Sequence, residues 1–438
     1  MLKRSLPLLA LTTLLALAAL AALPAVAAPS RAEDPEIVFW TARVERDPAD
    51  FLSPTRLGNL CLRKARETGD FSLYLQAEKA ASLALERNPN HLPAKITLAS
   101  AYRAQHKFKQ AVPLAEEVVR AQPDSPDGYA ELGDALLEMG EVKRAEAIYA
   151  RLKSLAPGMT SLARLANLTH LKGDVPGAIR YLALAAESGK QAGVQPEAIA
   201  WCYTNMGEMN WSTGKWSEAE RYYRRALQIT PNGYLPLEHL AELRAAQGRH
   251  AEALKLYDRV ISLNPAPEFY EAKAGVLAAL GRKREAKELE DRARDGFLKE
   301  VGAGNIGLYR HLSRFFAEVQ PNPAEALKWA QKDLEVRQDV HAYDTLAWAL
   351  YLNERVPEAV AASRKALALG TRDAEMFYHA GMIHRAAGNR SEAAKWLAKA
   401  LETNPRMEEA AQIRTLLKQL APSRRKKRVA GRSAASRL

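Results

Sequence analysis

The chain has 438 residues, and its composition is rich in alanine, leucine, arginine and glutamate, which are strong helix formers. The formal net charge of +12 lies mostly at the two ends, because residues 422–438 contribute seven positive charges and no acid, and Lys3 and Arg4 contribute two more. The rest of the chain carries only +3, so its charge gives no reason to expect a nucleic-acid-binding body. An all-helical protein is expected.

The N-terminus, residues 1–27, predicts a secretory signal peptide. Lys3 and Arg4 form a short basic start, an apolar stretch runs from Leu6 to Leu23, and small residues follow Pro24. This order is typical of an exported precursor, with cleavage after Ala27. The alternative is an uncleaved segment that anchors the protein to the inner membrane, because the apolar stretch approaches a membrane-spanning length. We expect a periplasmic or extracellular protein.

Alanine recurs along nearly all the rest of the chain at an almost constant interval. The successive intervals are 34, 34, 33, 41, 34, 33, 40, 33 and 34 residues. A period of this length predicts a solenoid of helical hairpins, in which each unit buries its apolar face against its neighbours. The ten alanines, each predicted near the start of a second helix, are Ala77, Ala111, Ala145, Ala178, Ala219, Ala253, Ala286, Ala326, Ala359 and Ala393.

The clearest unit covers residues 201–231. Its first helix carries the small residue Gly207, and its second helix carries Ala219, Tyr223 and Ala226 before Pro231 ends it. Small residues let two helices approach closely, and an aromatic ring fills the volume beside them. This pattern resembles the tetratricopeptide repeat (TPR), and it recurs along the chain. The resemblance implies an all-α, right-handed superhelix of about ten repeats, of a type found in exported bacterial proteins.

Two irregular intervals divide the array. We predict an N-terminal segment with a capping helix at 28–53, about four repeats at 54–188, about three at 197–300 and about three at 306–407. A capping helix is expected at 408–420 and a basic, disordered tail at 421–438. Glycine is frequent in the insertions around 188–197 and 301–307, which favours loops or hinges over helix. Cys61 and Cys202 lie about four repeats apart, too far for a disulfide, and are expected to be buried.

The resemblance implies that a ligand would bind on the concave surface, which is formed by the first helices. Aromatic side chains interleaved with hydrogen-bonding groups suit a peptide or protein segment. The alternative is that the aromatic rings only fill space between neighbouring helices. The candidate positions are Trp201, Asn205, Glu208, Trp211, Asp344, Trp348, Tyr351, Tyr378, His379 and Arg385.

No catalytic or metal-binding motif stands out in the sequence. It has no phosphate-binding glycine loop, no HExxH motif, no paired-cysteine spacing and no nucleophile elbow. His379 and His384 are five residues apart and would point in different directions on a helix. We therefore predict a non-catalytic protein without a cofactor or metal.

Two functions from different classes fit these features. The first is a scaffold in the bacterial cell envelope that binds an unidentified protein or peptide partner in its groove. The second is a tether whose basic tail binds an anionic surface such as lipid headgroups, a wall polymer or nucleic acid, with the array as a spacer. A merely solvated tail is a third interpretation, and no specific nucleic acid is expected. The tail candidates are Arg424, Arg425, Lys426, Lys427 and Arg428.

Overall fold

The computed structural model describes residues 34–421. These residues form ten consecutive helical hairpins, flanked by a single helix at each end, α1 (Pro35–Arg46) and α22 (Ala410–Leu420). The described part contains no β-strand, so the all-α solenoid is confirmed. The signal peptide, the residues up to 33, and the tail candidates Arg424 to Arg428 lie outside the described residues. None of the described helices is long and apolar enough to cross a membrane.

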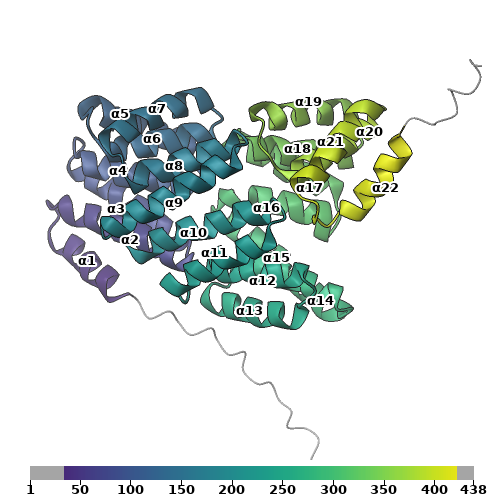
Figure 1. The fold of residues 1–438 in the computed structure, drawn as a ribbon. Helices are drawn as coiled ribbons and strands as arrows, with labels where there is room; N and C mark the ends of the chain where they lie inside the picture. Colours follow the sequence, from purple (N-terminus) through teal and green to yellow (C-terminus); the bar gives the residue numbers. More distant parts are fainter. Residues whose placement is uncertain (1–33, 422–438) are drawn as a thin grey trace, which may run out of the picture.

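The first five hairpins form the N-terminal half of the solenoid (Figure 1). Each consists of a first helix on the inner face and a second helix on the outer face. The pairs are α2 (Leu52–Thr68) with α3 (Ser72–Arg87), α4 (Leu92–Ala104) with α5 (Phe108–Ala121), α6 (Pro126–Glu138) with α7 (Val142–Leu155), α8 (Met159–Leu171) with α9 (Val175–Gln191), and α10 (Pro196–Trp211) with α11 (Trp216–Ile229).

The other five hairpins continue the same alternation. The eighth hairpin is irregular, because its first helix is short and passes into a π-helical segment, η2 (Phe315–Val319), after a 3-10 turn, η1 (Ile306–Leu308). The pairs are α12 (Tyr234–Ala246) with α13 (His250–Leu263), α14 (Pro267–Ala279) with α15 (Lys283–Gly302), α16 (Tyr309–Arg314) with α17 (Pro323–Val336), α18 (Val340–Leu352) with α19 (Val356–Ala366), and α20 (Ala374–Ala386) with α21 (Arg390–Thr403).

Small residues bring the two helices of a hairpin together, as the repeat pattern predicts. A Cβ atom added to Gly207 on α10 would lie 2.3 Å from Cε1 of Tyr223 on α11, so the tyrosine ring occupies the space that a side chain would need. Gly133 and Tyr149 make the same contact between α6 and α7. Both tyrosines are fully buried, and their burial supplies much of the apolar contact within the hairpin.

Left-handed residues separate the helices of nine hairpins. Seven of the nine are glycines, which adopt this conformation without steric cost. The second hairpin lacks the glycine, and His106 takes the left-handed position there with φ 59°; Glu354 does so in the ninth. Both cysteines are free and buried, so the prediction for them is confirmed.

The prediction that the two glycine-containing insertions form loops is confirmed only in part, because residues 192–195 and 303–305 leave the helices while the other inserted residues are helical. Helix α9 continues through residues 188–191 and helix α15 continues through Gly302, so the insertions mainly lengthen second helices. Gly189 packs closely against Met159 and Val194. A glycine in these helices therefore serves close packing as well as turning, which the composition of the segment does not reveal.

Successive turns of the superhelix touch one another along a line that we call the seam. The hairpin turn of each of the first five hairpins packs against the linker that follows the hairpin five units further along. Thr371 Oγ1 donates a 2.6 Å hydrogen bond to the carbonyl of Leu171, 200 residues away, and Gln338 N donates a 3.0 Å bond to Glu138 O. The five contacts are Gly69 with Asn264, His106 with Gly307, Gly140 with Gln338, Gly173 with Gly370, and Gly214 with Asn404.

The hydrophobic core also crosses the seam. Val340, Ala366 and Met376 from the ninth and tenth hairpins belong to one buried cluster with Leu136 and Tyr149 from the third. Figure 1 shows the ends of α6 and α8 beside α18 and α19. Successive turns of the solenoid therefore pack directly on one another through buried apolar side chains.

Candidate functional site

The inner face of the N-terminal hairpins holds a compensated network of charges. Arg103 on α4 binds Glu131 on α6 at 2.7 Å, and Arg164 on α8 binds Asp134 with both oxygens, at 2.8 and 2.9 Å. The Tyr149 hydroxyl donates to the same Asp134 at 2.9 Å. Charge-assisted bonds of this kind satisfy one another, so this region holds few groups that are free to bind a ligand.

A second compensated network lies on α16 and α17. Arg310 binds Asp333 at 3.2 Å and Asp339 at 2.9 Å, and Arg337 lies 2.8 Å from the other oxygen of Asp333. Asp333 is fully buried, and its burial raises its pKa despite the two arginines. This network fixes α17 against the inner helices.

On the inner face of the C-terminal hairpins, Arg314 pairs with Glu375 and His239 with Glu238, but further carboxylates of the same run have no ion-pair partner within the described part of the chain. Among residues 34–421, no arginine or lysine forms an ion pair with Glu268, Glu271 or Glu318. Burial and neighbouring acids raise the pKa of Glu268 and of Glu271 to about 7. Partial desolvation on the inner face likewise raises the pKa of Glu318 and of Glu238, with Glu375 adding to the first and Glu242 to the second. Each carboxylate therefore lies in the field of the next, from α12 to α20.

A cavity of about 240 Å³ lies along this run, between α16, α18 and α20. Its base is the buried His379, whose Nδ1 lies 2.9 Å from Asp344 Oδ2 and whose ring stacks on Trp348 at 4.2 Å. Burial opposes protonation of His379, but the charge of Asp344 and the acids around it raise the pKa of the imidazole to about 9. At neutral pH the ring is therefore an imidazolium among carboxylates.

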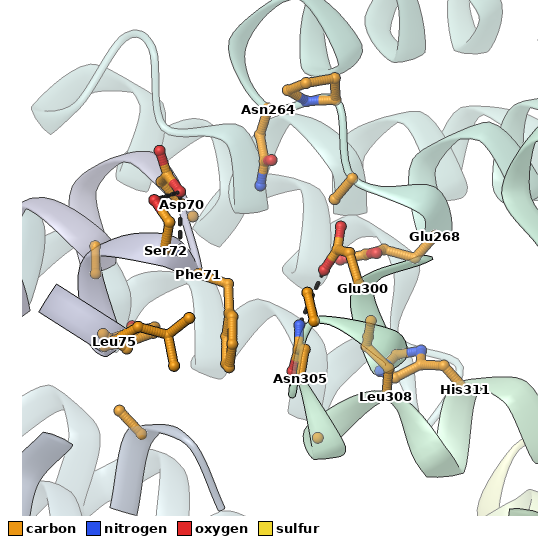
Figure 2. Close-up of a pocket in the computed structure, with 18 of the residues that line it drawn as sticks. Asp70, Phe71, Ser72, Leu75, Asn264, Glu268, Glu300, Asn305, Leu308 and His311 are labelled. Carbon is orange, nitrogen blue, oxygen red and sulfur yellow. Dashed lines mark hydrogen bonds between the residues drawn. The ribbon is translucent and has the colours of Figure 1, made fainter. Parts of the chain in front are cut away.

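A larger cavity of about 640 Å³ opens at the seam, where the first hairpin faces α14, α15 and η1. Figure 2 shows Phe71 and Leu75 on one side, and Glu268, Asn305 and His311 on the other. Asn305 Nδ2 donates to Glu300 at 2.9 Å. Burial and nearby arginines lower the pKa of His311 to about 4, so this imidazole is uncharged at neutral pH. His311 therefore does not neutralise the negative charge of Glu268 and Glu300 in this cavity.

The structure brings three of the sequence-predicted residues into one site: Asp344, Trp348 and His379 line the smaller cavity. Trp348 also stacks on Tyr351 at 4.9 Å. Trp201 is exposed and lies instead in a third, mostly apolar cavity of about 560 Å³ with Leu235.

Other predicted residues lie elsewhere or are occupied. Trp211 stacks on Trp216 at 5.6 Å within a core cluster, and Tyr378 is buried, so both rings fill space between helices as the alternative interpretation has it. The Asn205 amide donates to the carbonyl of Trp201. Glu208 and Arg385 are exposed on α10 and at the end of α20.

Sequence reasoning missed the residues that complete the smaller cavity, namely Arg314, Glu318 and Glu375. Arg314 and Glu318 lie in the most degenerate repeat, where the short α16 passes into the π-helical segment η2. Reading a fixed helical period through residues 306–339 cannot place them. Glu375 precedes His379 by four residues on α20, and this spacing puts both on one helix face. This four-residue spacing is the feature of the sequence that could have indicated Glu375 as part of the site.

Family models described as tetratricopeptide repeat match residues 96–160 and 345–413, 159–232, and 211–276. The chain is built from tetratricopeptide repeats. Together the matched segments cover more than half of it, and they follow the hairpins of the solenoid. TPR arrays are typically non-catalytic and bind protein partners, and the TPR hairpins here line both cavities.

Two curated proteins are similar in sequence to this TPR chain. Human protein O-mannosyl-transferase TMTC1 is 28% identical over 207 residues, which is 46% of this chain and 23% of the relative. The uncharacterized protein ycf37 of Pyropia yezoensis is 36% identical over 66 residues, which is 15% of this chain and 37% of the relative. The chain thus spans well under half the length of either relative.

Solved TPR structures resemble the chain at low sequence identity. A thermophilic TPR protein of Thermus thermophilus has 21% identity and a TM-score of 0.37, covering 47% of this chain and 99% of that one. Yeast Tom70 has 15% identity and a TM-score of 0.35, covering 84% and 95%. PilW, a type IV pilus biogenesis factor, has 17% identity and a TM-score of 0.40, covering 48% and 94%.

Proposed function

We propose that the protein is a non-catalytic scaffold that binds a lysine- or arginine-rich segment of a partner protein along its inner face. The observation that carries the proposal is the run of carboxylates on α12, α14, η2 and α20, in which Glu268, Glu271 and Glu318 form no ion pair within residues 34–421. Glu268 lies in the field of Glu300, and Glu271 in the fields of Glu318 and Glu268, and acids grouped in this way attract positive charge. A basic segment would supply the missing charge, as positive and negative surfaces do in protein complexes.

The two cavities support a partner that is an extended segment. The larger cavity lies at the seam and the smaller one on the inner face, and α16 borders both: His311 lines the first, and Arg310 and Arg314 line the second. The larger volume, about 640 Å³, is in the usual range of a ligand pocket, and the smaller, about 240 Å³, suits a single side chain. A segment along α14, α16 and α20 would reach both.

The N-terminal sequence supports an extracytoplasmic location for this scaffold. A basic start, an apolar stretch and small residues before Ala27 form a secretory signal in residues 1–27. We therefore place the proposed complex in a bacterial cell envelope, and retention of the mature protein in a periplasmic fraction would test that placement.

The direct test is fluorescence anisotropy with a labelled Lys-Ala repeat peptide, and with a Glu-Ala peptide of equal length as the comparison. Wild-type protein should bind the basic peptide, and the E268Q/E271Q double variant should bind it at least about tenfold more weakly because two carboxylates are lost. The matched control is E285Q/E358Q, which removes two exposed glutamates that pair with arginines of their own second helices. A metal chelator is present in every binding reaction, so that the affinity measured is that of the metal-free protein.

Two results would overturn the proposal: equal affinity for both peptides, or an equal loss in the double variant and its control. Removing residues 423–438 separates the tether function from the scaffold function. If capture of the basic peptide is unchanged by that deletion while binding to anionic vesicles disappears, the two activities belong to different parts of the chain. The scaffold proposal requires that the deletion leaves capture of the basic peptide unchanged.

A further inference from the structure

Three potential metal ligands converge in the smaller cavity. One ligand atom from each of Glu318, Glu375 and His379 lies within 4.8 Å of the other two. Glu375 and His379 are four residues apart on α20 and so share one face of that helix. Glu318 comes from η2 in the eighth hairpin, whereas α20 belongs to the tenth. The cluster therefore joins two elements, and it combines a nitrogen ligand with carboxylate oxygens.

The surroundings of His379 are those of a metal-binding histidine. Its side chain is only about 6% exposed, its Nδ1 lies 2.9 Å from Asp344 Oδ2, and Trp348 covers one face of the ring. A carboxylate on one ring nitrogen fixes the orientation of the imidazole and leaves the other nitrogen as the ligand. No hydrogen bond from residues 34–421 reaches Nε2 of His379. Nε2 therefore has no protein partner within the described residues, on a side chain that is otherwise almost fully buried.

The π-helical segment gives a local reason for the position of Glu318. A π turn inserts one residue into a helix and turns the following side chains to a new direction, and such turns are frequent at functional sites. Gln320 N donates to the carbonyl of Phe315, and Asn322 N to that of Phe316, so the segment is held at its end. Glu318 is exposed toward the cavity and forms no ion pair within the described residues.

The arginines of the cavity leave room for a cation. Arg310 is held by Asp333 and Asp339. Arg314 binds only Oε1 of Glu375, at 2.9 Å, which leaves Oε2 without a contact. The cavity volume of about 240 Å³ also accommodates water molecules that would complete the coordination.

We propose that Glu318, Glu375 and His379 bind a divalent transition-metal ion of the zinc class, with Asp344 as the residue that orients His379. One imidazole and two carboxylates suit Zn²⁺, whose bonds to such ligands are about 2.0–2.2 Å long, better than they suit Ca²⁺, which prefers oxygen alone. The ion replaces the proton on His379, because a ligand nitrogen must be deprotonated. The three ligand atoms lie within 4.8 Å of one another, and the exposed Glu318 side chain can move to bring its carboxylate into bonding distance of the ion.

The test is calorimetric titration of chelator-treated full chain with ZnCl₂, in the absence of any peptide. Wild-type protein should bind one equivalent. H379Q and E318Q should each weaken binding by about ten- to a hundredfold or more, and D344N, which acts through His379, should weaken it less. Quenching of Trp348 emission should accompany binding and be absent in W348F. Circular dichroism checks that each variant is folded.

The matched control is E242Q in the cluster of Glu238, His239 and Glu242 on α12, which also brings three ligand atoms within 4.8 Å but draws them from one helix. This variant should bind zinc as wild type does. The proposal is overturned if wild-type protein binds no zinc, if H379Q and E318Q bind it normally, or if E242Q alone abolishes binding. Because the titration contains no peptide, its failure leaves the scaffold function unaffected.

Discussion

Individual carboxyl groups on the inner face link the charge of the site to the stability of the fold. The pKa of Glu271 rises from its ordinary 4.5 to about 7, chiefly through burial. The folded protein then holds this proton more tightly than the unfolded chain, so the free energy of unfolding falls as the pH rises from 4.5 to 7. For His379, whose pKa rises from 6.5 to about 9, the added stability is complete below pH 6.5 and is lost as the pH rises through 9. Both groups favour mildly acidic conditions.

The substitution E271Q should therefore stabilise the protein in alkaline solution. Glutamine keeps the volume of the side chain and removes the buried negative charge, so the free energy of unfolding at pH 8 should rise by about 1–3 kcal/mol. At pH 5, where the wild-type carboxyl is already protonated, the difference should be small. Urea unfolding at both pH values measures it. A lower stability of E271Q at pH 8 would show that Glu271 is charged and paired in the native state.

Proton release should accompany binding of the basic peptide. A cation beside Glu268 and Glu271 lowers the pKa of both carboxyl groups from about 7. Calorimetry at pH 7 in buffers of different ionisation enthalpy should therefore show protons leaving the protein, and affinity should increase from pH 6 to pH 8. The E268Q/E271Q variant should release none from this pair. An affinity that decreases over this range would contradict the assignment of the site to the carboxylate run.

At the scale of the helical hairpin, packing depends on the pairing of a small residue with an aromatic ring. The Cβ of alanine at position 207 would lie 2.3 Å from Tyr223, a fully buried side chain that has no space to move. G207A should therefore destabilise the protein by about 1–3 kcal/mol through overpacking. The matched control is G275A on α14, where a Cβ meets nothing within 4 Å and alanine should stabilise the helix by up to about 1 kcal/mol. Thermal unfolding of both variants tests the contrast; equal shifts would contradict it.

The hairpins could be predicted from sequence because each one contains its own pattern of small and aromatic residues at fixed positions. Gly207, Ala219 and Tyr223 specify one pair of helices, and the alanine period counts the pairs. The position of Glu318 could not be predicted in this way, because a π turn breaks the period on which the reading depends. Depth within the array was equally hidden: Tyr378 is buried, whereas Trp348, also a candidate on a first helix, is only partly buried and lines the smaller cavity.

At the scale of the whole molecule, the seam is the feature that the repeat code does not specify. The code fixes how each hairpin meets its neighbour, whereas contacts such as Thr371 with Leu171 depend on the sum of many small rotations between repeats. The larger cavity lies at this seam, so it too was absent from the sequence prediction. The acids that face it, such as Glu268 and Glu300, come from residues 268–301, where the repeat pattern is among the weakest in the chain and the sequence does not fix the helix boundaries.

Alanine substitution at the seam should separate its contribution from that of the hairpin turn. Gly173 has φ 84°, and a Cβ there would lie 2.4 Å from the carbonyl oxygen of Gly370. Gly248 has a similar φ of 74° and open space around it. Both alanine variants therefore strain the backbone, but only G173A forces the superhelical turns apart. G173A should have the lower melting temperature and a larger radius of gyration by X-ray scattering; identical values for the two variants would show that the seam adds nothing.

The packing of successive turns on one another has a consequence for how the protein is made. An open solenoid can complete each repeat as it leaves the ribosome, because every unit needs only the one before it. Here the carbonyl of Leu171 can accept its hydrogen bond only after Thr371, 200 residues later, has been synthesised. The core around Tyr149 likewise lacks Val340, Ala366 and Met376 until the last hairpins are made. The first half of the chain thus leaves the ribosome with an exposed apolar edge that the second half later covers. A shortened chain would leave that edge open to chaperones or to another copy of the chain.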